Sequence, residues 1–269
     1  MNRRLLLLPV VCAATLMLVA GPHVAVPQAQ ARATGTISGH VRLTGPAPAN
    51  SAIRMGADPL CSRANAGKRP AQEVVLRSAD GGLANAFVDL QGTFPQTPVP
   101  TSQVTIDQHG CMFVPRVIGI RAGQTLKITN SDPTAHNLHS VSAKGNEFNV
   151  SQPKTGMTST FTVKSAELLR IKCDMHSWMV SYVGVSPHPY FAVSGSDGTF
   201  QIANVPPGHH TIQVWHERYG RLTAAVDVKA GATATADFSY TGKEQPSTAG
   251  IRDLQVPGEG WAVTLLAKR

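Results

Sequence analysis

Short runs in which apolar and polar residues alternate recur along the chain, and this two-residue period predicts β-strands rather than helices. The first run begins at Gly35 and places Ile37, Val41 and Leu43 on one face before a Gly-Pro turn. From residue 103 to residue 186, short β-branched runs are separated by Asp, Asn, Gly and Pro, and similar runs follow between residues 188 and 241. Many short strands divided by such turns predict an all-β protein built from sandwiches.

Three stretches outside these blocks have patterns of their own. Residues 46–72 are rich in Pro, Ala, Asn and Gly, which predicts a loop. Val74–Leu76 and Ala86–Leu90 are predicted as short strands on either side of a turn at Asp80. The C-terminal tail begins as a polar linker, and Val263–Leu266 is either a last strand or part of a disordered end.

The N-terminal residues have the pattern of a secretory signal peptide. Arg3 and Arg4 precede an apolar run from Leu5 to Ala20, and Ala29–Ala31 offers small residues at a cleavage site. A retained membrane anchor is the alternative, but Pro9 interrupts the run and its apolar length is short for a span. We therefore expect export, cleavage near residue 31, a periplasmic or secreted protein and no membrane span after cleavage.

Charge and motifs exclude several classes of function. Loss of residues 1–31 removes Arg3 and Arg4 and no acidic residue, which lowers the formal net charge from +8 to +6. The remaining basic residues form no dense run, so we do not expect nucleic acid binding. The chain contains no Gly-x-Ser-x-Gly elbow, no His-Glu-x₂-His motif and no phosphate-binding loop, so we do not expect an enzyme.

The cysteines point to a thiol with a special role. Without residues 1–31 the chain keeps Cys61, Cys111 and Cys173, an odd number for an oxidising compartment. Three disulfide pairings are open to these residues. The pairing of Cys61 with Cys111 is the hypothesis compatible with a metal site, because it leaves Cys173 free as a thiolate.

The clearest chemical motif is Cys173-x₂-His176-x₂-Met179, which follows a predicted strand, together with His136 from an earlier segment. One thiolate, two imidazoles and one thioether are the ligands of an electron-transfer copper site. Zinc also accepts cysteine and histidine, but a thioether is a poor zinc ligand. Each residue alone has an ordinary structural explanation; the combination predicts copper.

The motif and its surroundings resemble a cupredoxin of the amicyanin type, over about residues 103–186. The resemblance is carried by Phe113-x-Pro115, Arg121–Leu126, Asn130–Asp132, His136–His139 and the Cys173–Met179 loop. It implies a Greek-key sandwich with one type 1 copper site, whose ligands are His136, Cys173, His176 and an axial Met179. It also implies that Asn137 braces the cysteine loop and that His139 is not a ligand. Met175 and Trp178 depart from the amicyanin loop, which has proline and phenylalanine there.

The flanking segments resemble a carboxypeptidase regulatory-like, or transthyretin-like, β-sandwich. Gly35–Val41 resembles its opening strand and Ser196–Ile212 its later half. The resemblance implies that the cupredoxin is inserted in or fused to this smaller sandwich, and the whole arrangement resembles bacterial methylamine-utilisation proteins. The predicted parts are a signal peptide (1–31), the first part of the regulatory-like sandwich (34–92), the cupredoxin domain (93–187), the second part of the regulatory-like sandwich (188–241) and a linker with tail (242–269).

Three functions follow as expectations. The first is an exported blue-copper protein that passes single electrons to a periplasmic redox partner protein, with Met175 and Trp178 as an apolar docking patch. The second is a periplasmic copper carrier or sensor, in which Met175 is an extra soft donor during loading. The third is a carbohydrate- or protein-binding sandwich with an incidental copper site.

Overall fold

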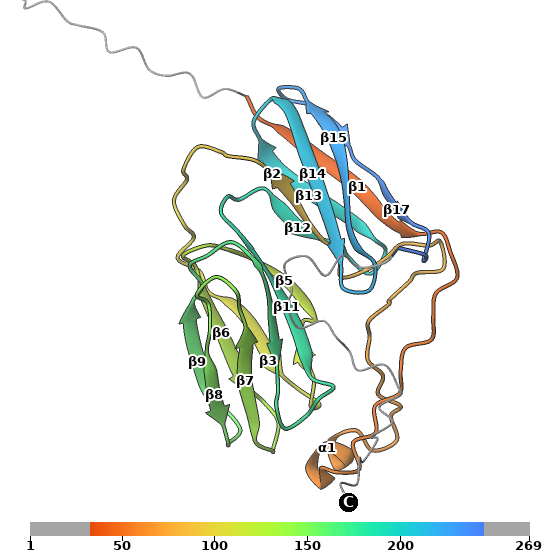
Figure 1. Ribbon diagram of the computed structural model, residues 1–269, viewed down its shortest axis with the longest axis vertical. Coiled ribbons are helices and arrows are strands. Elements are labelled where there is room, and N and C mark those ends of the chain that lie inside the picture. Colours follow the sequence, from red (N-terminus) through yellow and green to blue (C-terminus); the bar gives the residue numbers. More distant parts are fainter. Residues whose placement is uncertain (1–32, 245–269) are drawn as a thin grey trace, which may run out of the picture. The chain divides into compact units, whose positions relative to one another are not determined.

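The computed structural model describes residues 33–244, and within this range the chain is almost entirely β-structure (Figure 1). The predicted all-β fold is confirmed. The signal peptide and the strand considered at Val263–Leu266 lie outside the described residues. Within residues 33–244 the single helix, α1 (Pro59–Ala64), is far too short to cross a membrane.

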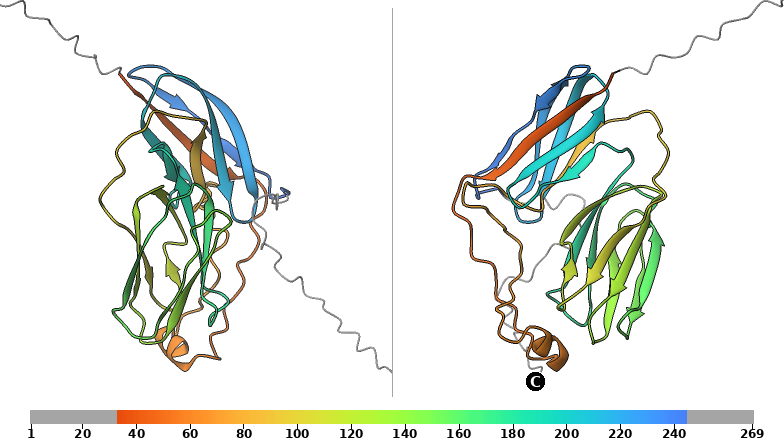
Figure 2. Two further views of the ribbon diagram at one scale, coloured as in Figure 1. Left: turned by 60° about the vertical axis from the view of Figure 1, so that its left-hand side comes forward. Right: turned by 180° about the vertical axis from the view of Figure 1, so that it is seen from behind.

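The first sandwich, so called from here on, consists of two four-stranded sheets. In one, β1 lies between β13 and β16 and also pairs with β17; the other has the order β12-β2-β14-β15 (Figures 1 and 2). The bounds are β1 (Gly35–Leu43), β2 (Phe87–Gln91), β12 (Phe191–Val193), β13 (Thr199–Val205), β14 (Gly208–His216), β15 (Gly220–Val228), β16 (Thr233–Thr235) and β17 (Phe238–Tyr240). Alternate residues of these strands, such as Ile37, Val41, Ile212 and Val214, form one apolar core between the sheets.

The second sandwich has a five-stranded sheet of order β5-β11-β10-β7-β8 and a four-stranded sheet of order β4-β3-β6-β9. The bounds are β3 (Val104–Gln108), β4 (Phe113–Val114), β5 (Val117–Arg121), β6 (Thr125–Asn130), β7 (His136–Val141), β8 (Asn149–Gln152), β9 (Thr158–Thr162), β10 (Leu168–Lys172) and β11 (Val180–Ser186). All nine strands come between β2 and β12 in the chain. The sandwich has its own apolar core, to which Leu126, Ile128, Leu169 and Ile171 contribute.

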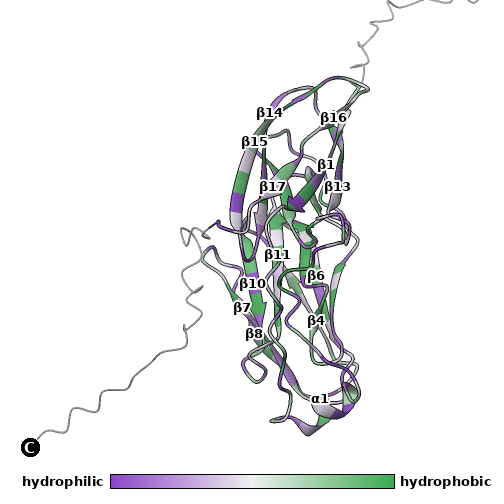
Figure 3. Cartoon of the chain, turned by 90° about the vertical axis from the view of Figure 1, so that its right-hand side faces the viewer, coloured by the Kyte–Doolittle hydropathy of each residue, from purple (hydrophilic) through white to green (hydrophobic). Residues whose placement is uncertain are grey.

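Both sandwiches show the expected alternation of apolar and polar residues, which is visible along β14 and β15 in Figure 3. β11 departs from this alternation, because all seven of its residues are buried. It pairs with β10 on one side and with β5 on the other, so it is a central strand of its sheet. A central strand covered on both faces has no solvent-facing positions to alternate.

Two local predictions are wrong. Val74–Leu76 is not a strand, because the Asn50 side chain takes both backbone groups of Val75, donating to its carbonyl at 2.8 Å and accepting from its N–H at 2.9 Å. These bonds occupy the groups that a strand partner would need. The predicted loop at 46–72 contains α1, which begins after Asp58 because Asp58 caps the helix and Pro59 fits its first turn.

Candidate metal centre

His136 is the first residue of β7 and is fully buried. Its Nε2 lies 2.9 Å from Oδ2 of Asp132, which belongs to the turn between β6 and β7. This contact fixes the orientation of the ring, and the other nitrogen, Nδ1, therefore faces inward. Nδ1 of His136 is 3.0 Å from Nδ1 of His176.

Cys173 and His176 come from the short loop between β10 and β11. The Cys173 N–H donates to the carbonyl of Met179 at 3.2 Å, and the Met179 N–H donates to the carbonyl of His176 at 2.8 Å. These bonds close the loop into a compact turn. The β-ladder then brings it to His136, because Lys172, just before the loop, pairs with His139 on β7.

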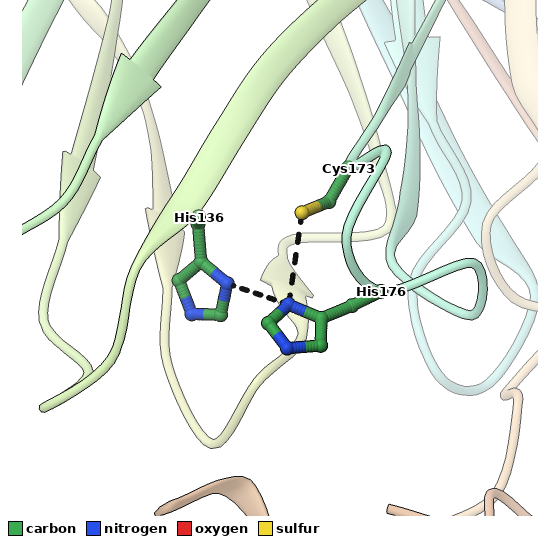
Figure 4. A group of neighbouring side chains, drawn as sticks. All are labelled: His136, Cys173 and His176. Atoms are coloured by element: carbon green, nitrogen blue, oxygen red, sulfur yellow. Dashed lines mark hydrogen bonds between the residues drawn. The ribbon is translucent and has the colours of Figure 1, made fainter. Parts of the chain in front are cut away.

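The three side chains converge on one point (Figure 4). Sγ of Cys173 lies 3.6 Å from Nδ1 of His176, and the ligating atoms of Cys173, His136 and His176 all lie within 4.8 Å of one another. All three residues are buried. Met179 is also fully buried and belongs to the same apolar core as Cys173. The structure thus brings together the predicted imidazoles and thiol and buries the predicted thioether beside their loop.

A carboxylate holds the outer nitrogen of each imidazole. Asp132 contacts His136, and Oδ2 of Asp58 lies 3.0 Å from Nε2 of His176. Metal-binding histidines commonly have such a partner on the nitrogen that does not bind the metal, because it fixes the ring and increases its basicity. Both rings are therefore oriented with Nδ1 available for a shared cation.

The electrostatics of the cluster favour a thiolate. Burial acts to raise the pKa of Cys173, but the contact with His136 and the N–H groups of Asn137, Met175 and His176 outweigh it and lower that pKa to about 7. Burial likewise acts to lower the pKa of His136, but Asp132 and Cys173 raise it to about 9. The cluster thus favours a positive charge next to the Cys173 sulfur. A metal cation bound there would take the place of the proton on His136.

Asn137 supports the cysteine loop from β7. Its backbone N–H points at Sγ of Cys173 over 3.5 Å, and its side chain donates to Oδ2 of Asp174 at 3.1 Å. His139 is also on β7, but its Nδ1 lies 2.8 Å from Oδ2 of the half-exposed Asp174. His139 is therefore paired with a surface carboxylate and is not in the cluster of Cys173 and the two buried histidines.

The predicted docking residues lie beside His176. Met175 is 51% exposed, whereas Trp178 is partly buried, with its ring centre 5.1 Å from that of His176. Both line a hollow of about 290 Å³ together with Ala57, Asp58, Thr134, Ala135 and His176. His176 itself is only 4% exposed.

A disulfide joins Cys61 in α1 to Cys111 in the turn between β3 and β4, with 5.7 Å between the Cα atoms. Cys173 is the free cysteine of residues 33–244 and is buried. Sγ of Cys61 lies 3.7 Å from Nε2 of His176, so the disulfide is adjacent to the cluster. It attaches the segment between β1 and β2 to the second sandwich.

Sequence reasoning missed both carboxylates. Asp58 had a local signal, because Asp before Pro is a helix start. Asp132 stands four residues before His136 in a turn motif, where a role in the turn alone would explain it. The contact of each carboxylate with its histidine is set by the tertiary structure and is not readable from the sequence; 118 residues separate Asp58 from His176.

The chemistry of the donor set fits copper. A thiolate and two imidazoles, with a buried thioether in the same loop as the thiolate, form a set that copper binds in both oxidation states. A structural zinc site would favour four cysteine or histidine ligands, and the cluster supplies three.

No protein-family model matches this chain, and no curated protein matches it. Among solved structures it is similar to a purple cupredoxin from Nitrosopumilus maritimus, with 23% identity, 30% of this chain and 98% of that chain covered, and a TM-score of 0.27. It is also similar to a methionine-to-alanine mutant of amicyanin with Cu(I), with 18% identity, 37% of this chain and 98% of that chain covered, and a TM-score of 0.29. A third similar structure is a copper-containing nitrite reductase from Thermus scotoductus, with 21% identity, 36% of this chain and 24% of that chain covered, and a TM-score of 0.28. These similarities cover a minor part of this chain, so the proposal below depends on its own residues.

Proposed function

We propose that this chain is an exported copper protein that carries single electrons through one mononuclear site. His136 and His176 would bind the copper through imidazole nitrogens, Cys173 would bind it as a thiolate, and Met179 would add a weaker thioether. The observation that carries the proposal is the convergence of two Nδ1 atoms and one Sγ in a buried cluster, with 3.0 Å and 3.6 Å between neighbouring atoms.

The residues around the site suit electron transfer. Copper would supply a one-electron couple, and fast transfer needs ligands that move little between the two oxidation states. The rings of His136 and His176 are each held by a carboxylate, and the Cys173 loop is closed by backbone bonds. An electron would leave the site through His176, which has Met175 and Trp178 beside it, and would pass to a periplasmic redox partner.

The chain order of the strands supports a division into two domains. We assign residues 93–187 to the copper domain and residues 34–92 and 188–241 to a regulatory-like sandwich that surrounds it in sequence. β3 to β11 all fall inside the first range, and β1, β2 and β12 to β17 fall inside the others. The first sandwich has the role of a non-catalytic scaffold in this proposal.

The visible spectrum of the Cu(II)-loaded protein tests the proposal. We expect one copper per chain and an intense thiolate-to-copper charge-transfer band that is absent in Cys173→Ser. His136→Gln should also lose the band, whereas His139→Gln, a matched change on the same strand, should keep it. A reversible one-electron wave in voltammetry should accompany the band. A colourless protein that binds only Cu(I) would contradict electron transfer.

That colourless result would favour the second candidate, a copper carrier. The observation behind it is the exposure of Met175, a soft thioether at the edge of the hollow in front of His176. A carrier should release Cu(I) to a competing chelator on mixing, and Met175→Leu should slow both uptake and release. An electron carrier should retain its copper under the same conditions.

A further inference from the structure

The outer edge of His176 is covered by a segment from the other sandwich. Residues 44–86 connect β1 to β2, both strands of the first sandwich, and carry α1 to the loop region of the second (Figures 1 and 2). Asp58, at the start of α1, reaches Nε2 of His176 at 3.0 Å. The strands of the second sandwich alone therefore do not complete the surroundings of the site.

Asp58 is held in a single orientation by four polar contacts. Its Oδ1 accepts the N–H groups of Leu60 at 2.8 Å and of Cys61 at 3.0 Å, which is the geometry of a helix N-cap. Its Oδ2 accepts the hydroxyl of Thr134 at 3.1 Å and contacts Nε2 of His176. One oxygen is thus committed to the helix and the other to the site.

The disulfide links the two carboxylates of the site. Asp58 accepts from the N–H of Cys61, and Asp132 accepts from the N–H of Cys111 at 2.8 Å. Each half of the disulfide thus positions a carboxylate that contacts one histidine. The Trp178 indole N–H also donates to the carbonyl of Cys111, at 2.9 Å.

We infer that Asp58 is a positioning residue for the copper site and that the first sandwich supplies it through the disulfide-linked segment 44–86. The inference rests on the proposed copper function. Asp58 would fix the ring of His176 and increase its basicity, as Asp132 does for His136, and such outer partners commonly contribute a factor of about 10–100 to metal affinity. The copper site would thus be built by two parts of the chain that are distant in sequence.

Asp58→Asn in the full chain tests the inference. Asparagine is as good an N-cap as aspartate, so α1 should remain, and the change removes only the carboxylate charge at His176. The matched control is Asp227→Asn, which removes the carboxylate from another Asp–His pair, the exposed Asp227 and His209 of the first sandwich. Three properties are measured: Cu(II) affinity by competition, reduction potential, and the His176 ring N–H signal in nitrogen NMR of the metal-free protein.

We expect Asp58→Asn to bind Cu(II) about 10–100-fold more weakly than wild type. Its reduction potential should rise, because a less basic imidazole stabilises Cu(II) less. The slowly exchanging His176 N–H signal should also be lost, whereas Asp227→Asn should match wild type in all three measurements.

If Asp58→Asn binds Cu(II) like Asp227→Asn, with the same potential, the inference is overturned while the copper function stands. Wild-type protein that takes up no Cu(II) would overturn the proposed function and the inference with it. Loss of the His176 signal without any change in affinity or potential would also reject the positioning role, since the contact would then be structural only.

Discussion

Each sandwich buries a histidine completely, and the two are held in opposite ways. His216, at the end of β14 in the first sandwich, has no hydrogen-bond partner for its Nε2 within residues 33–244. His136, at the start of β7 in the second sandwich, faces a carboxylate and a thiol. Equal burial in these two places leads to opposite charge states.

The pKa values of the two rings express this difference. Burial, with the charges of Arg116 and Arg218 added, lowers the pKa of His216 to about 3, so it is neutral at physiological pH. Burial also opposes the charge on His136, but Asp132 and Cys173 raise its pKa to about 9. In the metal-free protein, the stability contributed by the His136 proton is complete below pH of about 6.5 and is lost as the pH rises through 9. A buried histidine is thus a candidate ligand because of its neighbours.

The largest expected effect comes from separating the segment 44–86 from the second sandwich. In the double variant Cys61→Ser/Cys111→Ser, we expect the free energy of unfolding to fall by about 4 kcal/mol, because the disulfide closes a loop with a sequence separation of 50. Urea unfolding curves provide the measurement. Cys173→Ser is the control, since it keeps the disulfide and should lose much less. A double variant with the wild-type free energy of unfolding would show that the crosslink does not stabilise the fold.

Asp132→Ala should have the next largest effect. Asp132 is buried and accepts the N–H groups of Gly110 at 2.6 Å and of Cys111 at 2.8 Å in addition to its contact with His136. Its removal leaves three donors without this acceptor, of which those of Cys111 and His136 are buried, so we expect a loss of about 3 kcal/mol in the free energy of unfolding. The exposed Asp227→Ala should change it by less than about 0.5 kcal/mol. Similar values for the two variants would refute a structural role for Asp132.

His216 should have a smaller effect, on how the free energy of unfolding depends on pH. The unfolded chain takes up a proton on this residue below pH of about 6.5 and the folded chain does so only near pH 3, so stability falls as the pH drops through this window. Between pH 7 and pH 5 this residue should cost about 2 kcal/mol. His216→Phe should lack that part of the loss, because all other titrating groups are unchanged. Urea unfolding at pH 7 and pH 5 measures the free energy of unfolding of both proteins. An equal loss in wild type and in His216→Phe would contradict the neutral buried state of His216.

Much of the architecture could be predicted because it depends on local pattern. Alternation located most strands, and the spacing from Cys173 to Met179 identified one loop with three donor types. The spacing could not show how the loop meets His136. That depends on the antiparallel pairing of β10 with β7, in which Lys172 faces His139.

The parts that could not be predicted depend on contacts between distant residues. Val74–Leu76 has strand composition, but the side chain of Asn50 takes its backbone groups. Asp58 lies in a segment whose composition predicts a loop, and its contact with His176 depends on the packing of that segment against the second sandwich, to which the disulfide also links it. Local composition carries no information about either contact.

X-ray absorption spectroscopy of the copper-loaded protein tests the central claim most directly, because it reports the atoms bound to the metal. We predict one short copper–sulfur bond from Cys173 and two copper–nitrogen bonds from His136 and His176, with the sulfur contribution lost in Cys173→Ser. Copper bound to nitrogen and oxygen alone in the wild-type protein would contradict the account.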